Sequence, residues 1–175
     1  MQKKGVFLGR FQPIHNGHLK VIKTILEEVD ELIILIGSSQ YSHSFNNPFT
    51  AGERISMIRN ALKQKNIDLR RVYIIPIPDT NDNRIWVSHV AATIPQFDLF
   101  FTNNPLVSRL MKEAGYKTKN TKMFQRDKLS STEIRNRIYN HEPWESLVPE
   151  SVASFIETID GINRIRDIGK IELKL

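Results

Sequence analysis

Two histidines three residues apart, His15 and His18, follow a short turn that begins at Gly9. An apolar run over residues 6–8 precedes the turn, and a helical pattern begins at Leu19. Residues three apart share one face of a helix, so both imidazole rings can reach the same ligand. The N-terminus of a helix favours an anion, and an imidazole N–H donates to phosphate oxygens. This segment therefore predicts a phosphate site, although a lone histidine pair at this spacing is more often structural.

A second group of polar residues, Ser-Ser-Thr-Glu-Ile-Arg, covers residues 130–135. Ser130 and Glu133 have the spacing of a capping box, which predicts the start of a helix. Hydroxyl groups at that helix N-terminus, with Arg135 three residues after Thr132, could hold the β- and γ-phosphates of a nucleotide. The alternative is a plain helix cap followed by a surface arginine.

The elements that must position these residues alternate between strand and helix, which favours a parallel sheet covered by helices. The expected strands cover residues 5–8, 32–36, 72–77 and 98–102, with a short fifth strand within 117–124. The expected helices cover residues 17–29, a segment capped by Thr50 and Glu53, residues 85–93, residues 105–114 and parts of 130–175. We therefore expect an α/β fold, a Rossmann-like parallel sheet of about five strands flanked by helices, with a C-terminal helical segment.

Small and polar residues follow the expected strands, at Gly9, Gly37, Asp79 and Asn103. The carboxyl ends of parallel strands meet at one edge of the sheet, where open α/β sheets bind their ligands. We therefore expect these turns to gather there. The last residues, 162–175, mix apolar and basic types, which is compatible with packing on the core, a subunit contact or a frayed tail.

Composition narrows the class of protein. The 175 residues predict one domain over 1–175, and the absence of cysteine excludes disulfides and thiolate chemistry. The longest apolar run, residues 32–36, is too short to span a membrane, and the N-terminus carries no signal-peptide pattern, so a cytoplasmic protein is expected. The net charge of +6 suits either nucleic acid or a small polyanion such as a nucleoside triphosphate.

The first motif resembles the G-x-F-x-P-x-H-x-G-H signature of the nucleotidylyltransferase superfamily and matches it at every signature position. Residues 130–135 resemble the S-[ST]-T-x-[IL]-R motif that this superfamily carries after its fifth strand. Within the superfamily, the chain is most similar to the archaeal-type nicotinamide-nucleotide adenylyltransferases. The segments that carry this similarity include GRFQPIHNGHLKVIK, EEVDELII, NPFTAGERI, IWVSHV and LVPESV, and they cover nearly the whole chain.

This resemblance implies the transfer of an adenylyl group from ATP to nicotinamide mononucleotide (NMN), which yields NAD and pyrophosphate. It also implies a magnesium ion carried with ATP and a homo-oligomer, a hexamer among some relatives, with no nucleic-acid or membrane partner. His15, His18, Arg10 and Arg135 would be the catalytic residues. The residues implied for binding are Gly9, Arg10, Phe11, His15, His18, Asn104, Ser130, Thr132 and Arg135 for ATP, and Asn83 and Trp86 for NMN.

Such a reaction needs positioning and charge stabilisation more than a nucleophilic side chain, because the NMN phosphate is itself the attacking group. Some features depart from the family pattern, notably Ser131 and Asn103 where many relatives have glycine, and Asn46 where some have a basic residue. The alternative for Trp86 is a core tryptophan on a helix. Two alternatives remain open: another acceptor (nicotinate mononucleotide, FMN or phosphopantetheine), or a non-catalytic nucleotide sensor or RNA-binding protein.

Overall fold

The computed structural model describes residues 2–121 and 129–173, which form two compact units built from alternating segments of the chain. The first unit contains Met1–Arg10, Val21–Ser39 and Asp68–Lys122. The second contains Phe11–Lys20, Gln40–Ile67 and Met123–Leu175. Because six segments alternate, the chain passes five times from one unit to the other.

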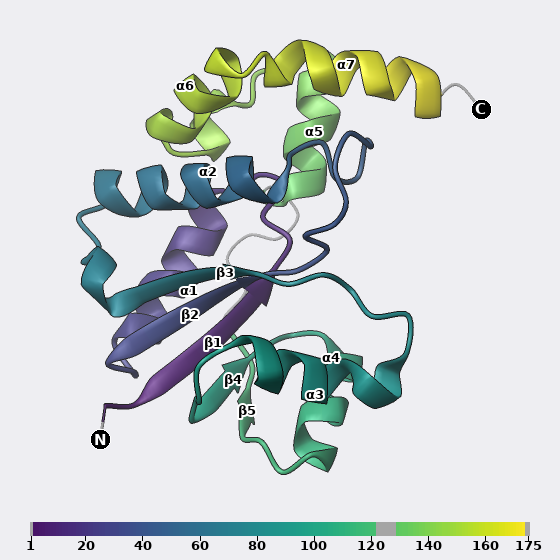
Figure 1. Cartoon of the computed structure of the whole chain (residues 1–175). Coiled ribbons are helices and arrows are strands. Elements are labelled where there is room, and N and C mark those ends of the chain that lie inside the picture. Colours follow the sequence, from purple (N-terminus) through teal and green to yellow (C-terminus); the bar gives the residue numbers. More distant parts are fainter. Residues whose placement is uncertain (1, 122–128, 174–175) are drawn as a thin grey trace. The chain divides into compact units, whose positions relative to one another are not determined.

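The first unit is built on a five-stranded parallel sheet with the order β3-β2-β1-β4-β5 (Figure 1). Its strands are β1 (Lys4–Gly9), β2 (Glu31–Ile36), β3 (Val72–Pro76), β4 (Leu99–Phe101) and β5 (Thr118–Lys119). The chain adds strands on one side of β1 and then returns to add β4 and β5 on the other. Ligands of such sheets bind where the strand order reverses, here at the carboxyl ends of β1 and β4. The expected α/β fold is confirmed.

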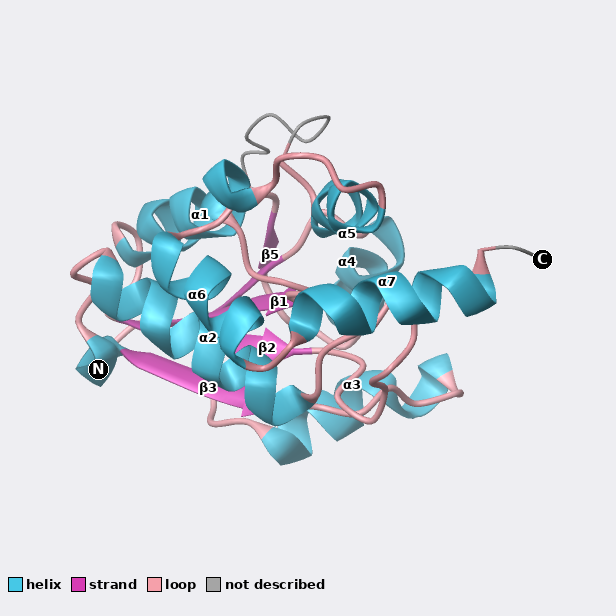
Figure 2. Ribbon diagram, turned by 90° about the horizontal axis from the view of Figure 1, so that it is seen from above, coloured by secondary structure: helices cyan, strands magenta, loops and turns pink. Residues whose placement is uncertain are grey.

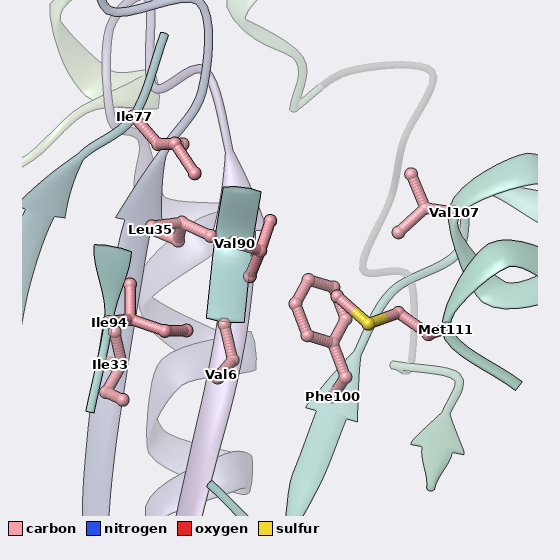
Figure 3. Packing of buried hydrophobic residues seen from close by; sticks show 9 residues of the cluster. All are labelled: Val6, Ile33, Leu35, Ile77, Val90, Ile94, Phe100, Val107 and Met111. Carbon is pink, nitrogen blue, oxygen red and sulfur yellow. The ribbon is translucent and has the colours of Figure 1, made fainter. Parts of the chain in front are cut away.

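Helices α3 (Asn83–Thr93) and α4 (Pro105–Glu113) belong to this unit, and α1 (Asn16–Leu26) enters it from the second unit. Helices α3 and α4 pack on one side of the sheet and bury an apolar cluster together with it (Figure 3). The residues drawn there are Val6, Ile33, Leu35, Ile77, Val90, Ile94, Phe100, Val107 and Met111. The apolar runs of the strands are explained by this burial, because both faces of β2 are covered.

The second unit is helical and contains α2 (Ala51–Gln64), α5 (Ser131–Tyr139), α6 (Glu150–Thr158) and α7 (Gly161–Glu172) (Figure 2). Helix α2 packs on α6, and α7 packs on both α5 and α6. Helix α7 approaches α5 closely at Gly169, where a Cβ atom would lie 2.5 Å from the ring of Tyr139. Glycine is therefore required for this packing, and residues 162–172 form a helix rather than a frayed tail.

The structure corrects two expectations about helix ends. Helix α1 ends at Leu26 and not at Val29, because the guanidinium of Arg71 donates to the carbonyl oxygens of both residues and satisfies them there. The predicted capping box at Ser130 is only half formed, as described below. The box at Thr50 and Glu53 is complete. Within residues 2–121 and 129–173, no helix has the length and apolar character needed to cross a membrane.

Candidate active site

The two histidines lie in the second unit, on the turn that leads into α1. Phe11 opens this turn with a left-handed backbone (φ 51°) and a buried side chain, and the Gln12–Pro13 peptide bond is cis. The rings of His15 and His18 stack with their centroids 3.7 Å apart, and the Phe11 ring lies 4.8 Å from that of His18. The expectation that the histidine pair shares one face is therefore confirmed.

Backbone hydrogen bonds determine which nitrogen of each ring carries the proton. The N–H groups of Gly17 and His18 approach Nδ1 of His15 at 3.1 and 3.3 Å, and the N–H of His15 approaches Nδ1 of His18 at 3.3 Å. An imidazole nitrogen that accepts a hydrogen bond is unprotonated, so each neutral ring carries its proton on Nε2. In this tautomer Nε2–H is the remaining donor group of each ring.

Burial keeps both rings neutral. The side chain of His15 is only 6% exposed, and this desolvation lowers its pKa to about 4. Desolvation also lowers the pKa of His18 well below its usual value, and the neighbouring His15 lowers it further. At pH 7 both imidazole rings are therefore neutral.

Gly17 allows the His15 ring to lie over the first turn of α1. A Cβ atom at this position would come within 3.0 Å of the ring atoms Cε1 and Nδ1 of His15 and within 3.4 Å of Cβ of Leu129. Any larger residue would displace the ring from the backbone N–H groups that orient it. The conformation of the histidine pair thus depends on glycine at position 17.

The second predicted motif forms the N-terminus of α5. Ser130 Oγ accepts a hydrogen bond from the Glu133 N–H at 3.1 Å, which confirms Ser130 as the helix cap. The carboxylate of Glu133 instead accepts from Arg137 Nε at 2.7 Å, so the capping box is half formed. The Thr132 hydroxyl lies 3.3 Å from Nη2 of Arg135, which places the two predicted phosphate ligands side by side.

Arg135 is not a surface residue, because its side chain is only 1% exposed. Its Nη1 donates to the main-chain oxygen of Gln12 at 2.9 Å, and Ser131 Oγ donates to the oxygen of Pro13 at 2.9 Å. These bonds join the N-terminus of α5 to the histidine turn. Ser130 is therefore a helix cap, as the alternative expected, but Arg135 is buried and is not the surface arginine of that alternative.

A loop over residues 44–49, here called the 44–49 loop, completes the surroundings of Arg135. Asn46 Oδ1 accepts from Nη2 of Arg135 at 3.4 Å, and the ring of Phe45 lies 5.9 Å from the guanidinium carbon. Gln12 holds this loop, since its buried side-chain amide pairs with both main-chain groups of Phe49. Sequence reasoning missed Gln12 because a single polar residue in a turn carries no periodic signal.

In the first unit, Gly9 ends β1, the exposed Arg10 follows it, and Asn104 caps α4. The Asn104 Oδ1 atom accepts hydrogen bonds from the N–H groups of Leu106 and Val107 at 3.0 and 3.3 Å. Asn104 also lines a polar cavity of about 570 Å³, together with the side chains of Asn103, Ser108, Arg109, Lys112 and Asn120. This volume lies within the range of small-molecule sites.

The two residues expected to bind NMN also lie in the first unit, on α3. Asn83 is exposed on the first turn of this helix, directly after its cap Asp82. Trp86 is half-buried, and its ring meets the edge of Phe100 at a centroid distance of 6.2 Å. Trp86 therefore packs on the apolar cluster with part of its surface, which leaves the rest exposed.

The predicted residues thus fall into two groups. His15, His18, Ser130, Thr132 and Arg135 come together in the second unit through the bonds described above. The first unit carries the other group, which consists of Gly9, Arg10, Asn83, Trp86 and Asn104. Over the described parts of the chain, no cluster of three or more His, Asp or Glu side chains is arranged to hold a metal ion.

The sheet, the histidine turn and the α5 N-terminus define a nucleotidyltransferase of the Rossmann-like class. A family model described as cytidylyltransferase-like matches residues 6–137, so the chain belongs to the cytidylyltransferase-like family. This finding confirms the superfamily that the two motifs indicated.

Individual relatives are more specific. The nicotinamide-nucleotide adenylyltransferase of Archaeoglobus fulgidus is 54% identical over 94% of this chain and 97% of its own length. The enzyme of the same name from Saccharolobus solfataricus is 53% identical over 94% and 96%. Among solved structures, a bifunctional NMN adenylyltransferase/ADP ribose pyrophosphatase from Francisella tularensis, complexed with AMP and a manganese ion, matches with a TM-score of 0.78 and 25% identity. That match covers 96% of this chain but only 52% of the Francisella protein.

Proposed function

We propose that this chain transfers the adenylyl group of ATP to NMN and releases NAD and pyrophosphate. The observation that carries the proposal is the joining of the histidine turn to the α5 N-terminus through Arg135 and Ser131. Two helix N-termini, two Nε2–H donors and one buried guanidinium suit a polyphosphate better than any uncharged ligand. Relatives of this name at about half identity over nearly the whole chain support NMN as the acceptor.

The chemistry follows from charge. An oxygen of the NMN 5′-phosphate attacks the α-phosphorus of ATP, and the bond to the bridging oxygen breaks so that pyrophosphate leaves with its electrons. The attacking phosphate is already an anion, so no side chain has to remove a proton. In this proposal His15 and His18 donate to oxygens whose charge increases in the transition state, while Thr132 and Arg135 hold the β- and γ-phosphates.

The remaining roles are proposed for residues of the first unit. Arg10 adds positive charge for the triphosphate, and Asn104 contacts the adenosine, supported by the polar cavity that it lines. The half-buried Trp86 stacks on the nicotinamide ring, and the amide of Asn83 recognises the carboxamide. Trp86 is suited to this because the perpendicular contact with Phe100 holds its ring in place.

Magnesium is proposed to arrive with ATP, held by phosphate oxygens and water, which agrees with the preference of this ion. When bound, the ion neutralises charge on the phosphates. Among the groups proposed around the triphosphate, the guanidinium of Arg135 has no lone pair for a metal, and the described residues contain no cluster of three His, Asp or Glu side chains that would hold the ion directly. The Francisella structure with AMP and a manganese ion supports a divalent ion in this class of enzyme.

The test is to incubate the protein with ATP, magnesium and one acceptor at a time, and to measure pyrophosphate. We expect release with NMN. Release only with nicotinate mononucleotide, FMN or phosphopantetheine would change the acceptor, and release with none of them would support a nucleotide sensor. Light scattering of the same sample tests the proposed homo-oligomer, for which a hexamer is the expected state.

A further inference from the structure

Gln12, on the histidine turn, contacts both the 44–49 loop and Arg135 of α5. Its side chain is 1% exposed, and its Nε2 donates to the oxygen of Phe49 at 2.9 Å. Its Oε1 accepts from the N–H of Phe49 at 3.0 Å. The amide thus satisfies both main-chain groups of one buried residue, as a neighbouring strand would. This pairing holds the 44–49 loop against the histidine turn.

The main chain of Gln12 also contacts Arg135. The carbonyl oxygen of Gln12 accepts from Nη1 of Arg135 at 2.9 Å. The 44–49 loop supplies two further contacts to the same guanidinium, from Asn46 Oδ1 and the ring of Phe45. These contacts therefore depend on Gln12, either directly through its carbonyl or indirectly through the loop that its side chain holds.

We propose that Gln12 is a positioning residue, whose side-chain amide sets the place of the guanidinium that binds the ATP β- and γ-phosphates. This inference rests on the proposed function for the identity of the ligand. Gln12 does not need to touch ATP. Its effect passes through the 44–49 loop. If the side-chain amide no longer holds Phe49, the loop can shift, and the contacts of Asn46 and Phe45 with Arg135 change.

The first test replaces the amide with an apolar side chain of similar length, in Gln12→Met. The dissociation constant of ATP is measured by calorimetry, and KM and kcat are measured with both substrates. We expect the ATP dissociation constant and KM to rise about tenfold, which is the effect of losing roughly one net hydrogen bond at the guanidinium. The KM for NMN should stay unchanged.

Gln12→Glu separates positioning from simple loss of structure. A protonated glutamate is isosteric with glutamine and can both donate to the Phe49 oxygen and accept from its N–H, whereas the carboxylate repels that oxygen. The ATP KM of Gln12→Glu, divided by that of the wild type at each pH, should therefore fall as the pH is lowered from 8 to 5.5. The ratio for Gln12→Met should not change with pH. This variant also keeps the proposal testable where Gln12→Met does not fold.

Gln64→Met is the matched control, because Gln64 Oε1 also accepts a main-chain hydrogen bond, from Ser151, but far along α2. Its ATP constants should equal those of the wild type. A wild-type ATP dissociation constant in Gln12→Met, or a loss confined to kcat with no pH-dependent recovery in Gln12→Glu, would overturn the positioning role. A wild-type protein that binds ATP but releases no pyrophosphate would instead overturn the proposed reaction.

Discussion

The two units of the chain differ in what they bury. The first unit surrounds its sheet with apolar side chains, and among its described residues Thr102 is the buried polar one. The second unit buries four polar or charged side chains, namely Gln12, His15, Arg54 and Arg135. Arg54 is fully buried on α2, with its Nε donating to the oxygen of Thr50.

This difference teaches where stability and function are located. Burial of a polar group opposes folding unless hydrogen bonds compensate, so a polar interior persists where another requirement maintains it. Under the proposed function, that requirement in the second unit is an anion site whose donors are oriented before the ligand arrives. The predictions below test this contrast, from the largest expected effect to the smallest.

The strongest test of the first unit is Ile33→Ala, in the middle of β2. Ile33 is fully buried in the cluster, so we expect the free energy of unfolding to fall by about 2–5 kcal/mol. Substrate constants of the folded fraction should not change. Urea denaturation together with steady-state kinetics measures both. Ile171→Ala, which alters a residue that is 72% exposed, is the control and should leave stability within about 0.5 kcal/mol.

In the second unit, His18→Ala should lower turnover and leave the stability of the fold unchanged, the reverse of Ile33→Ala. Loss of one donor to the developing charge typically costs about 10²–10³ in turnover, while the fold persists. Pyrophosphate release gives the rate, and circular dichroism reports the fold. His141→Asn changes an exposed histidine of the same unit and should retain full turnover. Turnover of His18→Ala near that of the wild type would contradict the proposed role of the pair.

Acid should destabilise the protein through the buried His15 of the second unit. The pKa of His15 is about 4 in the folded chain and 6.5 in a model peptide, so between these values the unfolded chain binds a proton that the native state does not. The free energy of unfolding therefore falls as the pH is lowered from about 6.5 to about 4, by about 3 kcal/mol from this residue. Urea midpoints across this range measure the fall. In His15→Gln the fall should be smaller, and an unchanged slope would argue against a buried neutral His15.

The smallest effect is expected at the C-terminal helix. Glu172 on α7 accepts from the N–H of Phe45 at 2.9 Å and so connects α7 to the 44–49 loop. We expect Glu172→Gln to raise the ATP KM about twofold to fivefold, since the amide oxygen still accepts from the Phe45 N–H but more weakly than the carboxylate. Asp167→Asn, at an exposed ion pair with Lys170 on the same helix, should leave the KM unchanged. Equal KM values in the two variants would remove α7 from the site.

The same contrast explains what could be predicted from the sequence. Strand β2 is a continuous apolar run, and the box of Thr50 and Glu53 is local, so both were predicted correctly. The end of α1 was wrong because Arg71, from a distant part of the chain, decides it. The half-formed box at Ser130 was missed because Arg137 competes for the Glu133 carboxylate, and no pattern in the sequence decides that competition.

In the site, too, the features set by local motifs were predicted and those set by distant contacts were not. The histidine pair and the residues from Ser130 to Arg135 follow local motifs, and the structure joins them in one unit as the chemistry requires. The pairing of Gln12 with Phe49 and the neutral state of His15 depend on contacts distant in sequence and on burial, which local patterns do not contain. The roles of all the site residues in binding and catalysis stay predictions, as does a single domain over residues 1–175.

The alternation of the two units along the chain has a consequence for how such a protein can change over evolutionary time. Neither unit is a continuous stretch of sequence, and α1 itself passes from one to the other. Recombination at one or two points in a gene therefore cannot exchange, duplicate or discard one unit alone. One or two crossovers therefore exchange parts of both units, so the sheet and the residues proposed to bind phosphate are inherited together.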